Sequence, residues 1–421
     1  MLIFYSLALI VLLQSILSLR GGVRYLAYVR RELEAKRNFF MPFASIIVPC
    51  RGLDQGLRAN LSALFEQHYP AYEIIFVADN ATDSALTIAE DVRKSFTDAR
   101  SRIVIAGRAH DSGQKVHNLR AAVQEIDLAS EVIVFVDTDA RPRADWLRSL
   151  VAPLADEGIG ATTGYRWFVP VAGGSASHLR SVWNASIATA LGQNGARNFC
   201  WGGSTAIRRA TFERLEMLNE WRGALSDDFA LTRTLQQAKL PIRFVPNCLT
   251  ASHEDCTFRQ LFEFTTRQLK ITRVYAPHLW KIVLFSNLLF VSVFFGGLAL
   301  VLTRAALDLP FQLPLALVTC IYALGMWKAF FRLRAVMLAL GDAQAARRES
   351  VFAHLFFWPL TAALYLYNAL AALFSRRITW RGITYELKSP TETVVISDAR
   401  SRDVTDESVA KVSGEEAPNV L

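Results

Sequence analysis

The chain is poor in charged residues and in cysteine for its length. Asp, Glu, Lys and Arg make up 20% of the 421 residues, and the five cysteines include no C-x-x-C pair. Together with 52% hydrophobic residues, this composition excludes an intrinsically disordered chain and a small disulfide-bonded scaffold. A P-loop is absent, as is a G-x-G-x-x-G after the first apolar strand, which argues against an ordinary dinucleotide-binding domain.

The hydrophobic residues are concentrated in four blocks that contain almost no charge. These blocks are residues 2–19, 282–303, 309–327 and 351–375. Each is long enough to cross a hydrocarbon core of about 30 Å as a helix. In the fourth block, Trp358-Pro359 can break the helix into a re-entrant pair. We therefore expect an integral membrane protein.

The residues that flank the first block indicate its orientation. The block has neither a basic start nor a small-residue cleavage pattern, so we expect an uncleaved anchor. Residues 20–37 are mainly basic, and a basic flank stays in the cytoplasm. We expect the large domain there, at a bacterial inner membrane in preference to a Golgi membrane. Although the net charge is +8, no basic-aromatic module is present, so nucleic acid is not an expected partner.

The composition changes along the chain predict six segments. They are an anchor (1–20), a basic juxtamembrane segment (21–41), an α/β domain (42–257), an amphipathic interfacial helix (258–280), a C-terminal membrane region (281–387) and a disordered tail (388–421). The interfacial helix is predicted because basic and aromatic residues alternate just before the second block. The tail is predicted to be disordered because it is polar and has no apolar period.

The α/β domain is predicted from apolar strands that alternate with helical stripes. The expected strands are residues 44–49, 73–78, 102–106 and 131–137. This alternation is typical of a mostly parallel sheet that is covered by helices on both faces. Ligands of such sheets bind beyond the carboxyl ends of the strands, so chemistry is expected just after Pro49, Ala78 and Val136.

Acidic residues cluster after two of these strands. Asp79 and Asp83 follow the second strand, and Asp137 and Asp139 follow the fourth. Two carboxylates leaving a buried strand can share one Mg²⁺ or Mn²⁺ with phosphate oxygens. The alternative is a pair of solvated turns, because Asp is common in turns.

Polar residues on the neighbouring helices allow two interpretations each. Lys115, at the start of a helix, can meet a nucleotide diphosphate or can be a solvated lysine. Asp227 and Asp228 precede a helix at 230–238, where they can cap it or one can act as a general base.

Two further segments carry candidate binding residues. Gly202-Gly203 suggests a close backbone approach beside Trp201, which we expect to be exposed. Arg267 and Lys270 of the interfacial helix can hold phosphate or can only anchor the helix to the membrane.

Five motifs in one order carry a resemblance to a known family. They read SIIVPCRG, QHYPAYEIIFVADNATD, VFVDTDA, GGSTAIRR and LSDDFALTRTL. In this order the chain resembles family 2 glycosyltransferases of the GT-A type, and it is most similar to their ceramide glucosyltransferase branch. The similarity extends through the C-terminal blocks to TWRGITYEL at 379–387. It implies a GT-A nucleotide-sugar-binding domain with transmembrane helices at both ends.

The resemblance also implies roles for the acidic residues. Asp79 and Asp83 match the cluster that contacts the nucleotide, at the same strand ends as Pro49. Asp137 and Asp139 match the motif that binds the metal and the diphosphate.

The remaining motifs imply the acceptor side of the site. Asp228 matches the proposed catalytic base, and Asp227 stands where Glu is usual. Arg267 and Lys270 fit the (Q/R)xxRW motif in part, with Lys in place of Arg and Ile271 in place of Trp. This loss affects the acceptor contact more than the donor site.

The expected function is that of a membrane-bound inverting glycosyltransferase. It would move one sugar from a UDP-linked donor to a membrane lipid such as ceramide, with Mg²⁺ or Mn²⁺. The alternatives are transfer of a hexose or N-acetylhexosamine to a hopanoid or phospholipid, a processive polysaccharide synthase, and an inactive membrane scaffold.

Overall fold

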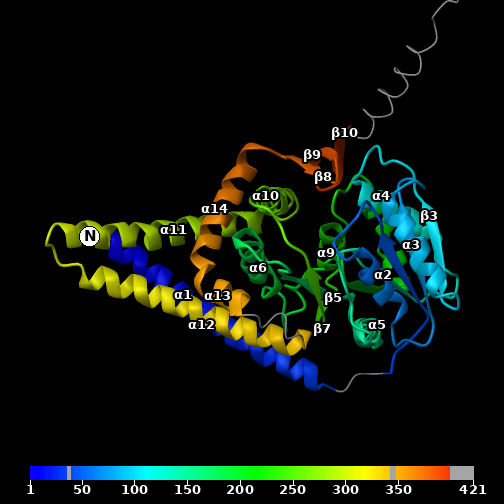
Figure 1. Cartoon of the computed structure of the whole chain (residues 1–421), viewed down its shortest axis with the longest axis horizontal. Coiled ribbons are helices and arrows are strands. Elements are labelled where there is room, and N and C mark those ends of the chain that lie inside the picture. Colours follow the sequence, from blue (N-terminus) through cyan, green and yellow to red (C-terminus); the bar gives the residue numbers. More distant parts are fainter. Residues whose placement is uncertain (36–38, 342–347, 399–421) are drawn as a thin grey trace, which may run out of the picture.

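The computed structural model describes residues 1–35, 39–341 and 348–398. A sheet domain lies at one end of the molecule and a group of long helices at the other (Figure 1). Helix α14 and a small C-terminal sheet lie where these two parts meet (Figure 1).

The main sheet has seven strands in the order β3-β2-β1-β4-β6-β5-β7. The strands are β1 (Ala44–Pro49), β2 (Tyr72–Ala78), β3 (Arg100–Ile105), β4 (Val132–Phe135), β5 (Ala161–Val169), β6 (Thr205–Arg208) and β7 (Ile242–His253). All neighbouring pairs are parallel except the two that involve β6, which is antiparallel to β4 and β5. The predicted α/β class with a mostly parallel sheet is therefore confirmed.

Helices cover both faces of this sheet because its central strands are apolar on both sides. The helices are α2 (Leu57–Phe65), α3 (Ser84–Ser95), α4 (Gln114–Gln124), α5 (Trp146–Val151), α6 (Ser175–Ala188), α7 (Arg209–Arg214), α8 (Met217–Glu220) and α9 (Asp227–Gln237). Ile46 packs in the core beneath α2 and α3, whereas its neighbour Ile47 packs in the core beneath α4 and α9. A short 3-10 helix, Ala152–Ala155, follows α5.

Within the described residues, three helices are long and apolar enough to cross a membrane. They are α1 (Leu2–Glu34), α11 (Pro277–Ala306) and α12 (Gln312–Leu340). The predicted boundary between anchor and basic segment at residue 20 is not a structural one, because α1 continues without a break to Glu34. Residues 36–38 of that segment lie outside the described residues.

The fourth apolar block is broken where the sequence predicts. It forms α13 (Arg348–Phe356) and α14 (Trp358–Phe374), which meet at an angle of 63° and are either one broken span or a re-entrant pair. Pro359 lies in the first turn of α14, a position that tolerates its missing N–H.

The anchor helix α1 is also part of the core of the sheet domain. The Tyr28 hydroxyl donates to the Phe244 carbonyl of β7 at 2.7 Å, and the rings of Tyr25 and Tyr28 stack on the Phe244 ring. The first apolar helix and the main sheet are therefore packed together.

The predicted interfacial helix is α10 (Phe258–Tyr275), which ends before the expected residue 280. Thr257 and Gln260 form a capping box at its start, and Ala276 separates it from α11. Its buried face packs on α6, α14 and the C-terminal sheet, while Phe258 is exposed.

The predicted disordered tail begins too early. Residues up to Asp398 form a three-stranded antiparallel sheet of β8 (Arg377–Trp380), β9 (Ile383–Ser389) and β10 (Glu392–Asp398). Alternate residues of β9, namely Ile383, Tyr385 and Leu387, are buried against α10, which stabilises the sheet. Residues 399–421 lie outside the described residues, so the rest of that prediction stays untested.

Candidate active site

One large cavity of about 1720 Å³ begins at the strand ends and continues between the apolar helices. At the strand ends it is lined by Pro49, Arg51, Lys115, Asp137, Asp139 and Asp228. At the other end it is lined by Gln14 and Ser18 of α1, Ser286 of α11, Lys328 and Arg332 of α12, and Tyr365 of α14. Small-molecule sites are usually about 300–1000 Å³, so this cavity has room for two substrates.

Lys115 links two of the predicted acidic groups. Its Nζ lies 2.7 Å from Asp137 Oδ1 and 3.2 Å from Asp227 Oδ1. Burial lowers the pKa of Lys115, but the nearby carboxylates outweigh burial and raise this pKa above its usual range. Burial raises the pKa of Asp227 to about 6 against the opposing effect of Lys115. Lys115 thus lies buried in the cavity wall and is not a solvated residue at the helix start.

Gly202 allows this cluster to form. A Cβ atom there would lie 2.5 Å from Asp227 Oδ2 and 2.6 Å from Lys115 Nζ, closer than real Cβ contacts. The close backbone approach expected at Gly202-Gly203 is therefore present. Trp201, however, is buried and not exposed, because its ring packs on Tyr165 and beneath Gly203.

Asp139 is the best candidate for a cation ligand. Its Oδ2 accepts a hydrogen bond from Arg166 Nη1 at 2.9 Å, while its Oδ1 is buried without a partner among the described residues. Burial raises the pKa of Asp139 to about 6, although Arg166 opposes this shift.

The donor set around Asp139 suits a metal that binds with its substrate. The described residues contain no group of three or more metal-ligating side chains. Asp137 and Asp139 can supply two carboxylates, and phosphate and water oxygens can complete a shell for Mg²⁺ or Mn²⁺. The residues present therefore fit a divalent cation.

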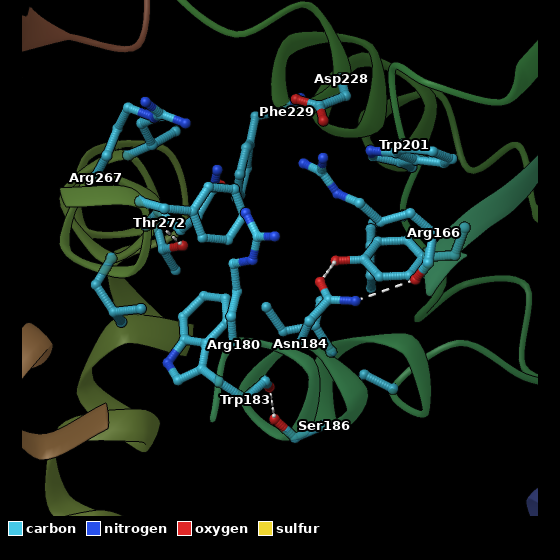
Figure 2. Close-up of a pocket in the computed structure, with 18 of the residues that line it drawn as sticks. Arg166, Arg180, Trp183, Asn184, Ser186, Trp201, Asp228, Phe229, Arg267 and Thr272 are labelled. Carbon is cyan, nitrogen blue, oxygen red and sulfur yellow. Dashed lines mark hydrogen bonds between the residues drawn. The ribbon is translucent and has the colours of Figure 1, made fainter. Parts of the chain in front are cut away.

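Asp228 is held at the edge of the cavity by the first turn of α9. The Phe229 N–H donates to its Oδ1 at 2.8 Å, and the Ser226 hydroxyl donates to the same oxygen. Among the described residues, its Oδ2 has only a 3.5 Å contact with the Gly202 N–H. Figure 2 shows Asp228 beside Trp201 and across the cavity from Arg267. The N-cap residue of α9 is Ser226, so neither Asp227 nor Asp228 takes the alternative capping role.

The first acidic cluster lies behind the cavity wall. Asp79 is buried and its Oδ2 lies 3.2 Å from Arg51 Nη1, and Arg51 lines the cavity. Asp83 caps α3, accepting hydrogen bonds from the N–H groups of Ala85 and Gly52. Neither carboxylate lines the cavity itself, so both support the loop that does.

Arg381, in the turn between β8 and β9, was not predicted from the sequence. Its Nη2 lies 2.5 Å from Asp54 Oδ1, and Asp54 Oδ2 accepts from the Thr138 hydroxyl at 2.6 Å. The Arg381 carbonyl in turn accepts from Arg51 Nε at 3.1 Å. These bonds fasten the C-terminal sheet over the strand ends. The motif at 379–387 was the sequence signal that could have indicated Arg381. However, Arg381 contacts Asp54 across 327 residues of sequence, which no local pattern predicts.

The two basic residues expected to hold phosphate are separated. Arg267 lines the cavity beneath the Trp380 ring, and burial lowers the pKa of its guanidinium to about 10. Lys270 does not line the cavity, because its Nζ donates to the Arg377 carbonyl at 2.7 Å. Ile271, which replaces the aromatic residue of the motif, is buried against the C-terminal sheet.

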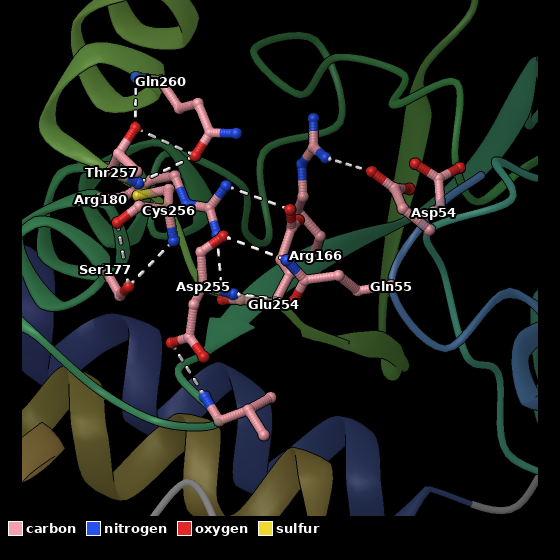
Figure 3. A network of polar contacts seen from close by, with 12 residues as sticks. Asp54, Gln55, Arg166, Ser177, Arg180, Glu254, Asp255, Cys256, Thr257 and Gln260 are labelled. Atoms are coloured by element: carbon pink, nitrogen blue, oxygen red, sulfur yellow. Dashed lines mark hydrogen bonds and ion pairs between the residues drawn. The ribbon is translucent and has the colours of Figure 1, made fainter. Parts of the chain in front are cut away.

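A second polar network supports the wall near α10. Arg180 pairs with Glu254 (Figure 3). Asp255 accepts from the backbone N–H groups of residues 171–173. Gln55 Oε1 accepts from the Asp255 N–H, which connects this network to the loop that carries Asp54.

Comparison with known proteins assigns the family. The model of the family described as "Glycosyl transferase family 21" matches residues 3–393. The chain belongs to glycosyl transferase family 21. This assignment confirms the predicted enzyme class, a glycosyltransferase, and with the sheet it confirms the predicted fold class.

A curated relative supports the predicted branch of this family 21 glycosyltransferase. Ceramide glucosyltransferase 3 of Caenorhabditis elegans is 25% identical over 120 residues, which are 27% of this chain and 26% of the relative. The match thus spans about a quarter of the relative's length. The resemblance to ceramide glucosyltransferases is confirmed.

Solved glycosyltransferase structures are also similar. The mannosyltransferase PcManGT from Pyrobaculum calidifontis, solved with GDP-Man and Mn²⁺, is 18% identical, covers 88% of this chain and 99% of its own, and gives a TM-score of 0.46. Glucosyl-3-phosphoglycerate synthase from Mycobacterium tuberculosis, solved with Mn²⁺ and UDP-glucose, is 16% identical, covers 59% and 82%, and gives 0.36.

Proposed function

We propose that this glycosyltransferase transfers one sugar from a UDP-linked donor to a lipid alcohol, with inversion at the anomeric carbon. The observation that carries the proposal is the continuity of the large cavity. It joins Asp137 and Asp228 at the strand ends to the apolar helices α1, α11, α12 and α14. A donor can therefore enter from water while a lipid enters from the membrane.

The donor end is suited to a diphosphate. Arg51, Arg381 and Lys115 line the cavity around the carboxylates of Asp137 and Asp139. A Mg²⁺ or Mn²⁺ ion held by these two carboxylates would neutralise charge on the leaving diphosphate. The side chains of Arg51, Arg381 and Lys115 would add positive charge around the same diphosphate.

Asp228, at the strand ends, is the base for the acceptor hydroxyl in this proposal. A lipid hydroxyl beside Asp228 gives its proton to Oδ2, since Oδ1 is occupied by two donors. The hydroxyl oxygen attacks the anomeric carbon from the face opposite the diphosphate. One C–O bond forms as the C–O bond to the diphosphate breaks, and UDP leaves with the bonding electron pair.

The basic ends of the apolar helices support a cytoplasmic site. Arg24, Arg30 and Arg31 lie on α1, and Lys328 and Arg334 lie on α12, all beyond the charge-free blocks. Because basic flanks are retained in the cytoplasm, these residues support a cytoplasmic position for the sheet domain that follows α1.

The Asp228→Asn variant tests the proposed base. We expect loss of transfer at least about a hundredfold, because general bases contribute about 10²–10⁴. UDP binding should remain, since the amide keeps a similar shape. Asp98→Asn, at an exposed position, is the matched control. The assay is incubation with UDP-sugars and total lipid extract, with and without Mn²⁺, followed by mass spectrometry.

The same assay contains the outcomes that would contradict the proposal. Equal turnover by Asp228→Asn would remove Asp228 from the base role. Long ladders of added sugars would contradict single transfer and favour a processive synthase. No release of UDP with any sugar or lipid would favour an inactive scaffold.

A further inference from the structure

Two basic side chains of α12 point into the membrane end of the large cavity. Lys328 and Arg332 are four residues apart, so they share one face of the helix, and both line the cavity. Arg332 is only 5% exposed, whereas Arg334 on another face is exposed and does not line the cavity. The helix thus turns two cations inward and one outward.

Neither inward cation has an acidic partner among the described residues. Lys328 Nζ donates to the Ser18 hydroxyl at 2.6 Å, and Arg332 Nη2 lies 3.4 Å from Nδ1 of His354. The Nε of Arg332 is also buried, and no described residue forms a hydrogen bond with it. Burying an uncompensated cation is costly, so the pair is suited to an anion that enters the cavity.

His354 orients Arg332 without adding charge. The Ser181 hydroxyl donates to the Phe168 carbonyl at 2.8 Å, so it accepts from His354 Nε2 at 3.1 Å. Nδ1 of His354 is then free to accept from Arg332, which makes the imidazole neutral. The ring is held in place by stacking on Trp167, with centroids 4.9 Å apart.

The position of Lys328 and Arg332 relative to the hydrocarbon core indicates the source of the anion. Lys328 lies beside Ser18 and Gly22 of α1, where a Cβ on Gly22 would be 3.3 Å from Lys328 Cγ. The charge-free block of α1 ends at residue 19. Lipid phosphates lie at the boundary of the hydrocarbon core, so this level suits a headgroup phosphate.

We propose that Lys328 and Arg332 bind the headgroup phosphate of the acceptor lipid. The acceptor is then a phosphate-bearing lipid with a free hydroxyl and not a neutral ceramide. This proposal rests on the proposed function, because the hydroxyl must reach Asp228 through the same cavity. A cation that only sets membrane topology has no need to be buried in a cavity, as the exposed Arg334 illustrates.

Lipid binding by the purified full-length chain tests the site directly. Native mass spectrometry compares retention of phosphatidylglycerol with that of diacylglycerol carrying the same acyl chains. The wild type should prefer phosphatidylglycerol, and Lys328→Gln/Arg332→Gln should weaken that preference about ten- to hundredfold. Arg334→Gln is the matched control and should bind as the wild type does, while Arg332→Lys should retain most of the preference.

Three outcomes of this binding experiment would overturn the proposal. One is equal retention of the two lipids by the wild type. Another is an unchanged preference in the double glutamine variant. The third is binding of inorganic phosphate without binding of phosphatidylglycerol, which would make the anion a free ion. Thermal unfolding of each variant confirms that it is folded before its binding is compared.

The transfer assay separates this proposal from the proposed function. A glycolipid product that contains phosphorus supports a phosphate-bearing acceptor, and a product without phosphorus overturns it. If UDP is released with neutral lipids only, the lipid-phosphate proposal fails and the glycosyltransferase proposal stands. If phosphatidylglycerol binds but no sugar is transferred to any lipid, the proposed function fails.

Discussion

Replacing Lys115 by methionine tests whether the charge balance of the site stabilises the fold. Lys115 bridges Asp137 and Asp227, at 2.7 and 3.2 Å, with only 14% of its side chain exposed. Removing one partner of a buried ion pair costs about 3–5 kcal/mol because the other charge is left uncompensated. In a domain of roughly 200 residues each kcal/mol lowers Tm by about 2–4 °C, so we expect a loss of at least about 6 °C.

The pH dependence gives this experiment a second readout. Burial raises the pKa of Asp227 to about 6 in the folded state, above its unfolded value. A carboxyl with a raised folded pKa favours folding at low pH, and that contribution is lost as the pH rises through about 6. Without Lys115 this pKa rises further. The destabilisation should therefore be larger at pH 7.5 than at pH 5.

The assay is thermal unfolding in detergent and in the presence of a chelator. Unfolding is monitored by tryptophan fluorescence. Lys94→Met, at an exposed position of α3, is the control and should change the free energy of unfolding by less than about 0.5 kcal/mol. Equal unfolding temperatures for Lys115→Met and the wild type at pH 7.5 would refute the reasoning, as would a loss that does not depend on pH.

Two other variants test the architecture of the site. Arg381→Gln should raise KM for the UDP-sugar about tenfold, because it removes a cation from the diphosphate end and frees Asp54, while Arg377→Gln outside the cavity lining should have little effect. Equal KM values would remove Arg381 from the donor site. Gly202→Ala should abolish transfer because its Cβ would displace Asp227 and Lys115, whereas Gly192→Ala, which has open space around it, should remain active. Full activity of Gly202→Ala would show that the cluster can rearrange.

The strands and acidic clusters could be predicted because their signals are local. An apolar run such as residues 44–49 determines a buried strand, and the carboxyl ends of parallel strands must meet at one edge. Asp79 and Asp137 could therefore be placed at the same edge of the sheet without coordinates. The antiparallel strand β6 and the burial of Trp201 could not, because both depend on which distant segments pack beside them.

The C-terminal sheet shows a second limit of local reasoning. Its strands are short and polar on one side, and their burial depends on α10, more than 100 residues earlier in the chain. The bond between Arg381 and Asp54 likewise joins opposite ends of the sequence. The topology of the fold brings these residues together. A spacing pattern within one segment of the sequence therefore cannot predict their contact.

Under the proposed function, the packing of α1 on Phe244 sets the height of the candidate active site above the membrane. A flexible linker would let the sheet domain approach and leave the lipid surface, but here the apolar helix α1 continues into the core of the domain. Each residue inserted between Ser18 and Tyr25 would lift the domain by about 1.5 Å and turn it by about 100°. Under that proposal, the length of α1 determines which lipid hydroxyls can reach Asp228.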